Sequence, residues 1–188
     1  MQTNKTEIDH KIIKGCIKGD LKYQEMLYRQ YYAYGMGITL RYTKNKEEAI
    51  EVLNDSFLKV FDKIRMYNTN QSFRNWFRQI TVNTSIDHYR KSKRMVPTES
   101  YDNYDQQSSA LIESNHMDAE DILKLIRTIP EYYAMVFNLY EIEGLDHNEI
   151  AEKLNISVNT SRSSLSRAKK MLRELFEKQN YTNYVGAV

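Results

Sequence analysis

The chain is poor in residues that interrupt helices or cross-link a fold. It has six glycines and two prolines among 188 residues, and this scarcity of helix breakers favours helices. Its single cysteine, Cys16, excludes an internal disulfide and is typical of a reducing compartment, so we expect a cytoplasmic location. No stretch is long and apolar enough for a transmembrane helix, and polar residues 1–9 lack a signal-peptide core. Membrane insertion is therefore not expected.

Motifs for metal binding and catalysis are also missing. The four histidines are scattered, and none lies at metal-ligand spacing from Cys16 or from another histidine. The sequence contains no glycine-rich phosphate loop and no nucleophile elbow. We therefore expect neither an enzyme nor a bound metal or cofactor.

Charge is distributed in three blocks, although the formal net charge is only +2. Residues 74–94 contain six basic residues and one acid, and residues 157–173 contain five basic residues and no acid. Between them, residues 97–121 contain seven acids and no Lys or Arg. Two basic segments on either side of an acidic one can contact a single polyanion at two places.

Apolar residues recur at steps of three and four through most of the chain, which predicts an all-α protein. From about Lys5 to Arg94 the pattern indicates several helices, with Asp20 and Ser72 as N-caps of two of them. Residues 95–116 lack this periodicity and read as a flexible acidic linker. We therefore predict two small helical domains, residues 1–94 and 117–180, joined by that linker.

The strongest local pattern is a pair of helices in the C-terminal half. Asp146 with Glu149 three residues later matches a capping box for a short helix that ends at Leu154. Residues 155–157 then form a tight turn, and a second helix follows from about Val158 to Lys178. Upstream, Pro130 suits the first turn of a helix and Gly144 the position just after its end.

This pair predicts a helix-turn-helix, in which the second helix keeps one face apolar and presents the other to the major groove of DNA. Arginine can bind guanine or phosphate, and Ser and Thr can bind either. The candidate DNA-binding residues on the outer face are Thr160, Arg162, Ser163, Ser166, Arg167 and Lys170. The alternative is a helical hairpin with a solvated basic face.

Residues 148–157, with Thr160, Arg162, residues 165–169 and residues 172–175, resemble region 4 of extracytoplasmic-function (ECF) sigma factors of the sigma-70 family. That resemblance implies a domain that reads the −35 promoter element and contacts the β flap of RNA polymerase. The sequence departs from the family at Ser161, where Val is frequent, and at Ser164, where a basic residue is common. We expect Ser161 to weaken helix packing slightly.

The N-terminal half resembles the same family independently. Residues 53–61, Leu-Asn-Asp-Ser-Phe-Leu-Lys-Val-Phe, are similar to region 2.2, which binds the β′ clamp helices of core polymerase. The residues that the resemblance assigns to this contact are Asn54, Asp55, Phe57, Leu58 and Phe61. For Phe57 the alternative is a ring buried in the core.

Phe73, Trp76, Ile80, Val82 and the Asp87-x-x-Arg90 pattern resemble regions 2.3 and 2.4, which open and read the −10 element. By that resemblance the loop from Tyr67 to Ser72 accepts a flipped base, with Tyr67 available for stacking. The implied −10 residues are Tyr67, Asn68, Asn70, Gln71, Asn83, Asp87, Arg90, Lys91, Lys93 and Arg94. Trp76 is interpreted as a core residue.

The resemblance implies an alternative sigma factor that binds core polymerase, recognises promoter DNA, melts it and starts transcription. An anti-sigma factor is the further partner that it implies. A conventional helix-turn-helix regulator, with the N-terminal half as a dimerisation or sensor domain, would instead bind a palindrome without polymerase. A helical adaptor whose basic faces bind acidic proteins is a third interpretation.

Overall fold

A computed structural model describes residues 3–94 and 119–185, and side chains within residues 10–92 and 123–178. Within these residues every regular element is helical, as predicted, and there is no strand. The contacts within the chain divide it into two compact units, Met1–Tyr89 and Arg90–Val188. The predicted linker, 95–116, and the side chains of Lys93 and Arg94 lie outside the described residues.

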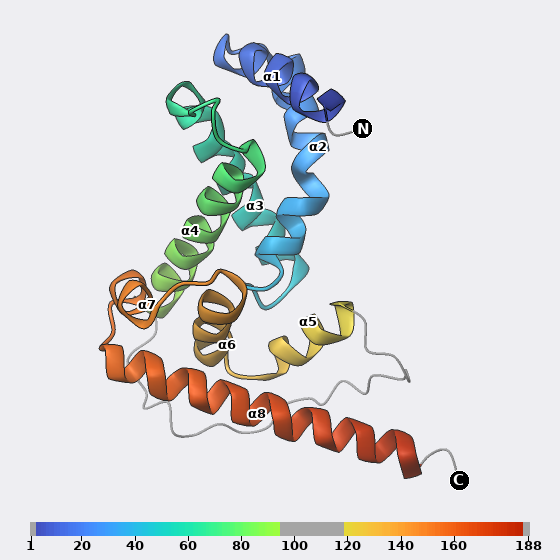
Figure 1. Cartoon of the computed structure of the whole chain (residues 1–188), viewed down its shortest axis with the longest axis vertical. Coiled ribbons are helices and arrows are strands. Elements are labelled where there is room, and N and C mark those ends of the chain that lie inside the picture. Colours follow the sequence, from blue (N-terminus) through green and yellow to red (C-terminus); the bar gives the residue numbers. More distant parts are fainter. Residues whose placement is uncertain (1–2, 95–118, 186–188) are drawn as a thin grey trace. The chain divides into compact units, whose positions relative to one another are not determined.

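Unit 1 is built from four long helices and one short turn of helix (Figure 1). In order, these elements are α1 (Thr3–Ile17), α2 (Leu21–Thr39), α3 (Lys46–Lys63), η1 (Ile64–Met66) and α4 (Phe73–Arg94). Aromatic rings from three helices meet in the core, where Phe77 of α4 lies 5.5 Å from Tyr31 of α2 and 5.0 Å from Phe57 of α3, between ring centroids. Burial of these rings supplies the main driving force that holds the helices together.

Short polar side chains define where these helices begin. The Asp20 carboxylate accepts a hydrogen bond from the Lys22 backbone N–H at 2.9 Å, which confirms the predicted cap of α2. Asn45 caps α3 in the same way through the N–H of Glu48, at 2.8 Å. Helix α4 begins directly after Ser72, whose backbone carbonyl accepts from the Trp76 N–H at 3.1 Å.

Two glycines of α2 stand in opposite environments. A Cβ atom on Gly35 would lie 2.4 Å from Leu53 Cδ1 and 3.0 Å from Phe77 Cζ, whereas one on Gly37 would meet nothing within 4 Å. We expect Gly35→Ala to lower the free energy of unfolding by about 1–3 kcal/mol through overpacking. Gly37→Ala should raise it by about 0.5–1 kcal/mol, because alanine favours the helix. Urea unfolding followed by circular dichroism measures both, and changes of the same sign would contradict this packing.

Unit 2 places three short helices and a π-helical turn against one long helix (Figure 1). These elements are α5 (Ala119–Thr128), α6 (Glu131–Phe137), η2 (Asn138–Ile142), α7 (His147–Leu154) and α8 (Val158–Val185). Helix α8 packs against α5, α6 and α7. It continues to Val185, beyond the predicted end at Lys178.

The connection from α6 to α7 turns through η2 and a glycine. Pro130 is the N-cap of α6, one residue before the predicted first turn, and its carbonyl accepts from the Ala134 N–H at 3.0 Å. Gly144 has a φ of 74°, a left-handed conformation that glycine adopts without strain, so its predicted place after the helix is confirmed. This turn therefore sets the direction of α7 relative to α6.

Candidate functional sites

Helix α7 begins with a complete capping box. The Asp146 carboxylate accepts from the backbone N–H of Asn148 and of Glu149, at 2.7 and 2.8 Å. The Glu149 carboxylate in turn accepts from the Asp146 N–H at 2.8 Å, which confirms the predicted reciprocal cap. The hydrogen bond from the Glu149 N–H is the largest cause that lowers the pKa of Asp146 below its ordinary value of 3.8. The cap therefore stabilises α7 fully at pH values above 3.8. This stabilisation is lost as the pH falls through the lower pKa that Asp146 has in the folded chain.

The turn between α7 and α8 fixes the angle of the helix-turn-helix. Asn155 has a φ of 55° and ends α7 in the left-handed conformation, which asparagine tolerates better than most residues. Ser157 then accepts the backbone N–H of Thr160 at 3.0 Å, at the start of α8. The tight turn predicted over residues 155–157 is therefore confirmed.

Ser161 joins the two helices by a polar contact. Its hydroxyl is fully buried and lies 3.0 Å from Nδ1 of His147, the first residue of α7. The His147 ring also stacks on Tyr140, with 4.6 Å between ring centroids. Where the family frequently has valine, this chain therefore has a serine that can form a hydrogen bond between the two helices. The expectation that Ser161 weakens helix packing slightly did not include this bond. Ser164 stands at a position where a basic residue is common in the resembled family. It is buried as well and faces the core.

The predicted DNA-binding residues lie on the exposed side of α8. Buried Ser161, Leu165 and Ala168 recur at steps of three and four and form the inner face. The exposed predicted residues are Thr160, Arg162, Ser163, Ser166, Arg167 and Lys170. The structure therefore brings all six onto the surface of one helix, as a helix that enters a groove requires.

Two cations at the margins of this surface are held by unit 2 itself. The Arg167 guanidinium donates to the buried Tyr133 hydroxyl at 3.1 Å, and Lys169 forms an ion pair with Glu141 at 2.7 Å. Arg162, by contrast, makes no hydrogen bond or ion pair with the residues that the structure describes. Arg162 is therefore the arginine of this surface that is free to bind a new partner.

The loop that connects η1 to α4 is held closed by its own hydrogen bonds. The Tyr67 hydroxyl donates to the Gln71 carbonyl, and the Gln71 N–H donates to the Asn68 carbonyl at 3.0 Å. The Asn68 side chain also accepts from the Asn70 N–H at 3.0 Å, while the side chains of Asn68, Asn70 and Gln71 remain exposed. A fixed backbone with exposed amides is suited to read the edge of an unpaired base.

Tyr67 is mostly buried beneath this loop. Only 8% of it is exposed, and its ring packs on Phe73 and Trp76 with centroid distances of 5.5 and 5.1 Å. In this structure Tyr67 therefore supports the loop from within the core, and stacking of a base on its ring stays a prediction. Trp76 is half-buried in the same cluster, in agreement with its interpretation as a packing residue.

The remaining predicted −10 residues lie on α4. Asp87 forms an exposed ion pair with Lys59 of α3 at 3.0 Å, so a basic residue offsets its negative charge. Lys91 is exposed, whereas Asn83 and Arg90 are half-buried. Sequence reasoning missed Lys59, because its partner lies 28 residues farther along the chain.

The predicted polymerase-binding helix, α3, divides into a buried and an exposed side. Phe57 is only 2% exposed and packs on Tyr28 and Phe77, so the prediction that it contacts polymerase is wrong and its alternative, a core ring, is confirmed. Leu58 is 67% exposed, Asn54 and Asp55 are exposed, and Phe61 is half-buried. Leu58, Asn54 and Asp55 are therefore available to a partner on the exposed side of α3.

Asn54 is oriented by a neighbouring helix. Its amide oxygen accepts from the Tyr28 hydroxyl of α2 at 3.0 Å. Burial is the main cause that raises the pKa of Tyr28 above its ordinary value of 10.0, so the hydroxyl keeps its proton and donates. The hydrogen bond therefore holds the exposed Asn54 side chain in one orientation.

The described residues offer no sign of other chemistry. Burial is the main cause that raises the pKa of Cys16 to about 11, so at neutral pH this cysteine is a protonated core residue. No group of three or more metal-ligating side chains occurs in residues 10–92 and 123–178. Among the helices described, none is both long and apolar enough to cross a membrane.

Comparison with known proteins assigns both units to one family. Residues 27–95 match the model "Sigma-70 region 2", and residues 119–172 match "Sigma-70, region 4". The chain is 26% identical to the ECF RNA polymerase sigma-E factor of Haemophilus influenzae, over 87% of this chain and 93% of that protein. It is 29% identical to the RNA polymerase sigma factor YlaC of Bacillus subtilis, over 80% and 90%.

A solved structure of the sigma factor RpoE with the anti-sigma factor NepR from Bartonella quintana is also similar to this chain. The TM-score is 0.49 at 17% identity, and the match covers 81% of this chain and 96% of that one. The two family models occur in the expected order and together cover most of the sequence. The chain therefore belongs to the sigma-70 family and is an alternative sigma factor of the extracytoplasmic-function group.

Proposed function

We propose that this sigma factor binds core RNA polymerase through α3 of unit 1 and reads the −35 element through α8 of unit 2. The observation that carries the second assignment is the exposed row of Arg162, Ser163 and Ser166 opposite the buried face of α8. A helix with one locked face and one free basic face can enter a major groove and contact base edges and phosphates.

We further propose that the loop over residues 67–72 captures a base of the −10 element. Its exposed amides belong to Asn68, Asn70 and Gln71, and the internal hydrogen bonds fix the loop backbone and the Asn68 side chain before DNA arrives. Unstacking a base costs a few kcal/mol, and contacts made only with the flipped base offset that cost. Lys91 of α4 then binds backbone phosphates.

This function requires no covalent chemistry on the chain. Binding energy from core polymerase and from two DNA contacts directs initiation, and the polymerase itself makes the phosphodiester bonds. We therefore propose that the chain is not an enzyme. The β′ clamp helices, the β flap, promoter DNA and an anti-sigma factor are partners that rest on membership of the family.

Run-off transcription tests this function directly. Purified core polymerase is incubated with fragmented DNA of the source genome, with and without the chain, and new transcripts are sequenced. Discrete transcripts that require the chain support the proposal, and their upstream sequences give the −10 and −35 elements. A chain that binds duplex DNA but neither co-elutes with core nor yields transcripts would instead be a conventional regulator. Salt-sensitive duplex binding separates that regulator from a helical adaptor for acidic proteins.

A further inference from the structure

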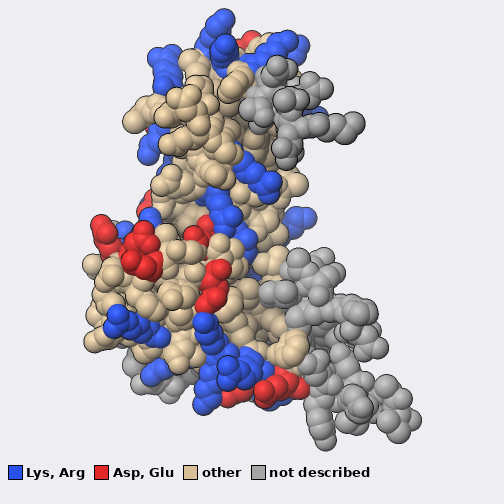
Figure 2. Space-filling view, in the orientation of Figure 1, with Lys and Arg blue, Asp and Glu red and all other residues tan. Residues whose placement is uncertain are grey.

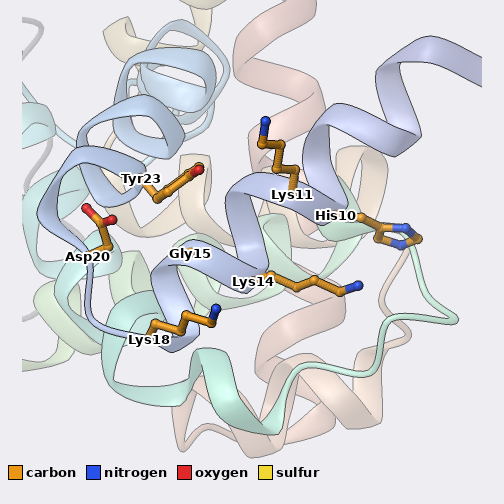
Figure 3. Close-up of a pocket in the computed structure, with 7 residues that line it drawn as sticks. All are labelled: His10, Lys11, Lys14, Gly15, Lys18, Asp20 and Tyr23. Atoms are coloured by element: carbon orange, nitrogen blue, oxygen red, sulfur yellow. The ribbon is translucent and has the colours of Figure 1, made fainter.

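A hollow of about 480 Å³ lies along α1 and the start of α2, and its lining contains none of the residues of the candidate sites described above. Its volume falls within the range of roughly 300–1,000 Å³ that is typical of small-ligand sites. The residues that line it are His10, Lys11, Lys14, Gly15, Lys18, Asp20 and Tyr23 (Figure 3). Lysine is the commonest residue of this lining.

The packing of α1 explains why these lysines share one surface. Ile12, Ile13 and Cys16 are buried in the core of unit 1, so the opposite side of the helix carries the basic residues. Gly15 lies beneath them, where a Cβ atom would be 2.1 Å from Cγ of Tyr23. The Tyr23 ring therefore packs directly on the backbone of α1 and forms a rigid floor for the hollow.

Among the side chains that the structure describes, few acids lie near the lysines of the hollow. The side chains of Lys11, Lys14 and Lys18 form no hydrogen bond or ion pair with the described residues, whereas Lys59 and Lys169 pair with acids at 3.0 and 2.7 Å. Asp20 is the only acid among the described residues of the lining, and its carboxylate already caps α2. Like charges spaced three and four residues apart on a helix repel one another, and a bound anion relieves that repulsion.

We propose that this hollow binds phosphate groups, in a ligand that carries two or more adjoining phosphates. Lysine binds phosphate as a point charge, and three lysines suit a ligand with several negative charges. Figure 2 shows Lys and Arg gathered at the end of unit 1 that holds α1. Two sources supply such phosphates, a free polyphosphate compound and the backbone of single-stranded DNA.

The DNA source follows from the position of α1 and rests on the proposed function. Helix α1 packs on η1, the turn that leads directly into the loop over residues 67–72. A DNA strand whose base enters that loop carries its neighbouring phosphates toward the same end of unit 1 (Figure 1). The free-polyphosphate source requires no promoter function, so the two are separable by experiment.

The first arm of the test measures free phosphates by isothermal titration calorimetry on the full chain. The probes are inorganic tripolyphosphate and orthophosphate, and the variant combines Lys11→Gln, Lys14→Gln and Lys18→Gln. A matched control combines Lys22→Gln, Lys46→Gln and Lys63→Gln, three exposed lysines of unit 1 outside the hollow. Saturable tripolyphosphate binding that weakens about tenfold or more in the first variant alone supports the proposal with a free ligand.

The second arm measures a fluorescent single-stranded oligonucleotide at several salt concentrations. If DNA is the source, the hollow variant should lower the slope of log affinity against log salt by about 2, since each lost phosphate contact accounts for about 0.7. The matched control should retain the slope of the original chain. Equal changes in both variants, or no change in either arm, would overturn the proposal. Because run-off transcription is scored separately, that outcome is distinct from failure of the sigma function.

Discussion

Leu58→Asp is expected to reduce affinity for core polymerase by about 100-fold or more while leaving the fold of unit 1 intact. The side chain is 67% exposed on α3, so the folded chain alone gains little from its burial. A docked partner would cover it together with Asn54, which the Tyr28 hydroxyl already orients. Placing a carboxylate in such an apolar contact typically costs about 3 kcal/mol or more, which corresponds to that loss of affinity.

A matched control distinguishes a docking residue from any exposed leucine. Leu21, at the start of α2, is 77% exposed and belongs to the same unit. Leu21→Asp should leave core binding unchanged in a fluorescence-anisotropy titration with labelled chain, and equal weakening by both variants would contradict a specific contact through Leu58. Circular dichroism melting curves should coincide for the two variants and the original chain.

The adjacent phenylalanine is expected to behave in the opposite way. Phe57 packs among Tyr28, Phe61 and Phe77, and its ring is only 2% exposed. Phe57→Ala should lower the free energy of unfolding by about 3–5 kcal/mol, because it leaves a cavity in the core. Two adjacent residues are thus expected to differ in role, Phe57 in stability and Leu58 in binding. Urea unfolding of Phe57→Ala and Leu58→Asp measures the difference in their free energies of unfolding.

Patterns within a few residues predicted the local structure of the helix-turn-helix. The Asp146–Glu149 capping box, the tight turn over residues 155–157 and the glycine at position 144 each depend on a short segment, and all three are confirmed. The π-helical turn over Asn138–Ile142 was not predicted, because no residue type marks it as glycine or asparagine mark a turn. Local structure can therefore be predicted from sequence where a cap or turn nearly requires one residue type.

Contacts between residues far apart in the sequence could not be predicted in this way. Arg167 reaches Tyr133 across 34 positions, and His147 reaches Ser161 across 14, although each pair consists of ordinary helical residues. The family resemblance placed Phe57 and Leu58 on the same predicted contact helix, but it did not say which of them the neighbouring helices cover. The three-dimensional packing of α2 and α4 against α3 decides that question, which is why Phe57 is a core ring while Leu58 is exposed.

Arg162→Ala is expected to weaken binding to a −35 duplex by roughly 5- to 150-fold, equivalent to the 1–3 kcal/mol of one good arginine contact. The arginine is exposed near the start of α8 and has no partner among the described residues, so its removal breaks no contact of the folded domain. Duplexes whose sequence comes from the run-off transcripts are titrated by fluorescence anisotropy, beside a scrambled duplex.

Arg173→Ala is the matched control, since it removes the same charge from the same helix about 16 Å farther from the turn. It should alter −35 affinity much less than Arg162→Ala, and equal losses would show that only the net charge of α8 matters. Core binding should be unchanged in both variants, because neither residue belongs to unit 1.

The scrambled duplex then reveals how Arg162 binds. If it contacts a base edge, its removal affects the matched duplex and spares the scrambled one. If it contacts a phosphate, both duplexes lose affinity alike and the salt slope falls by about 1. Arg167 differs because the Tyr133 hydroxyl holds its guanidinium at 3.1 Å, which restricts the directions in which it can meet DNA. Helix α8 therefore carries two different cations on the same surface: Arg162, which can change its orientation, and Arg167, which the Tyr133 hydroxyl holds.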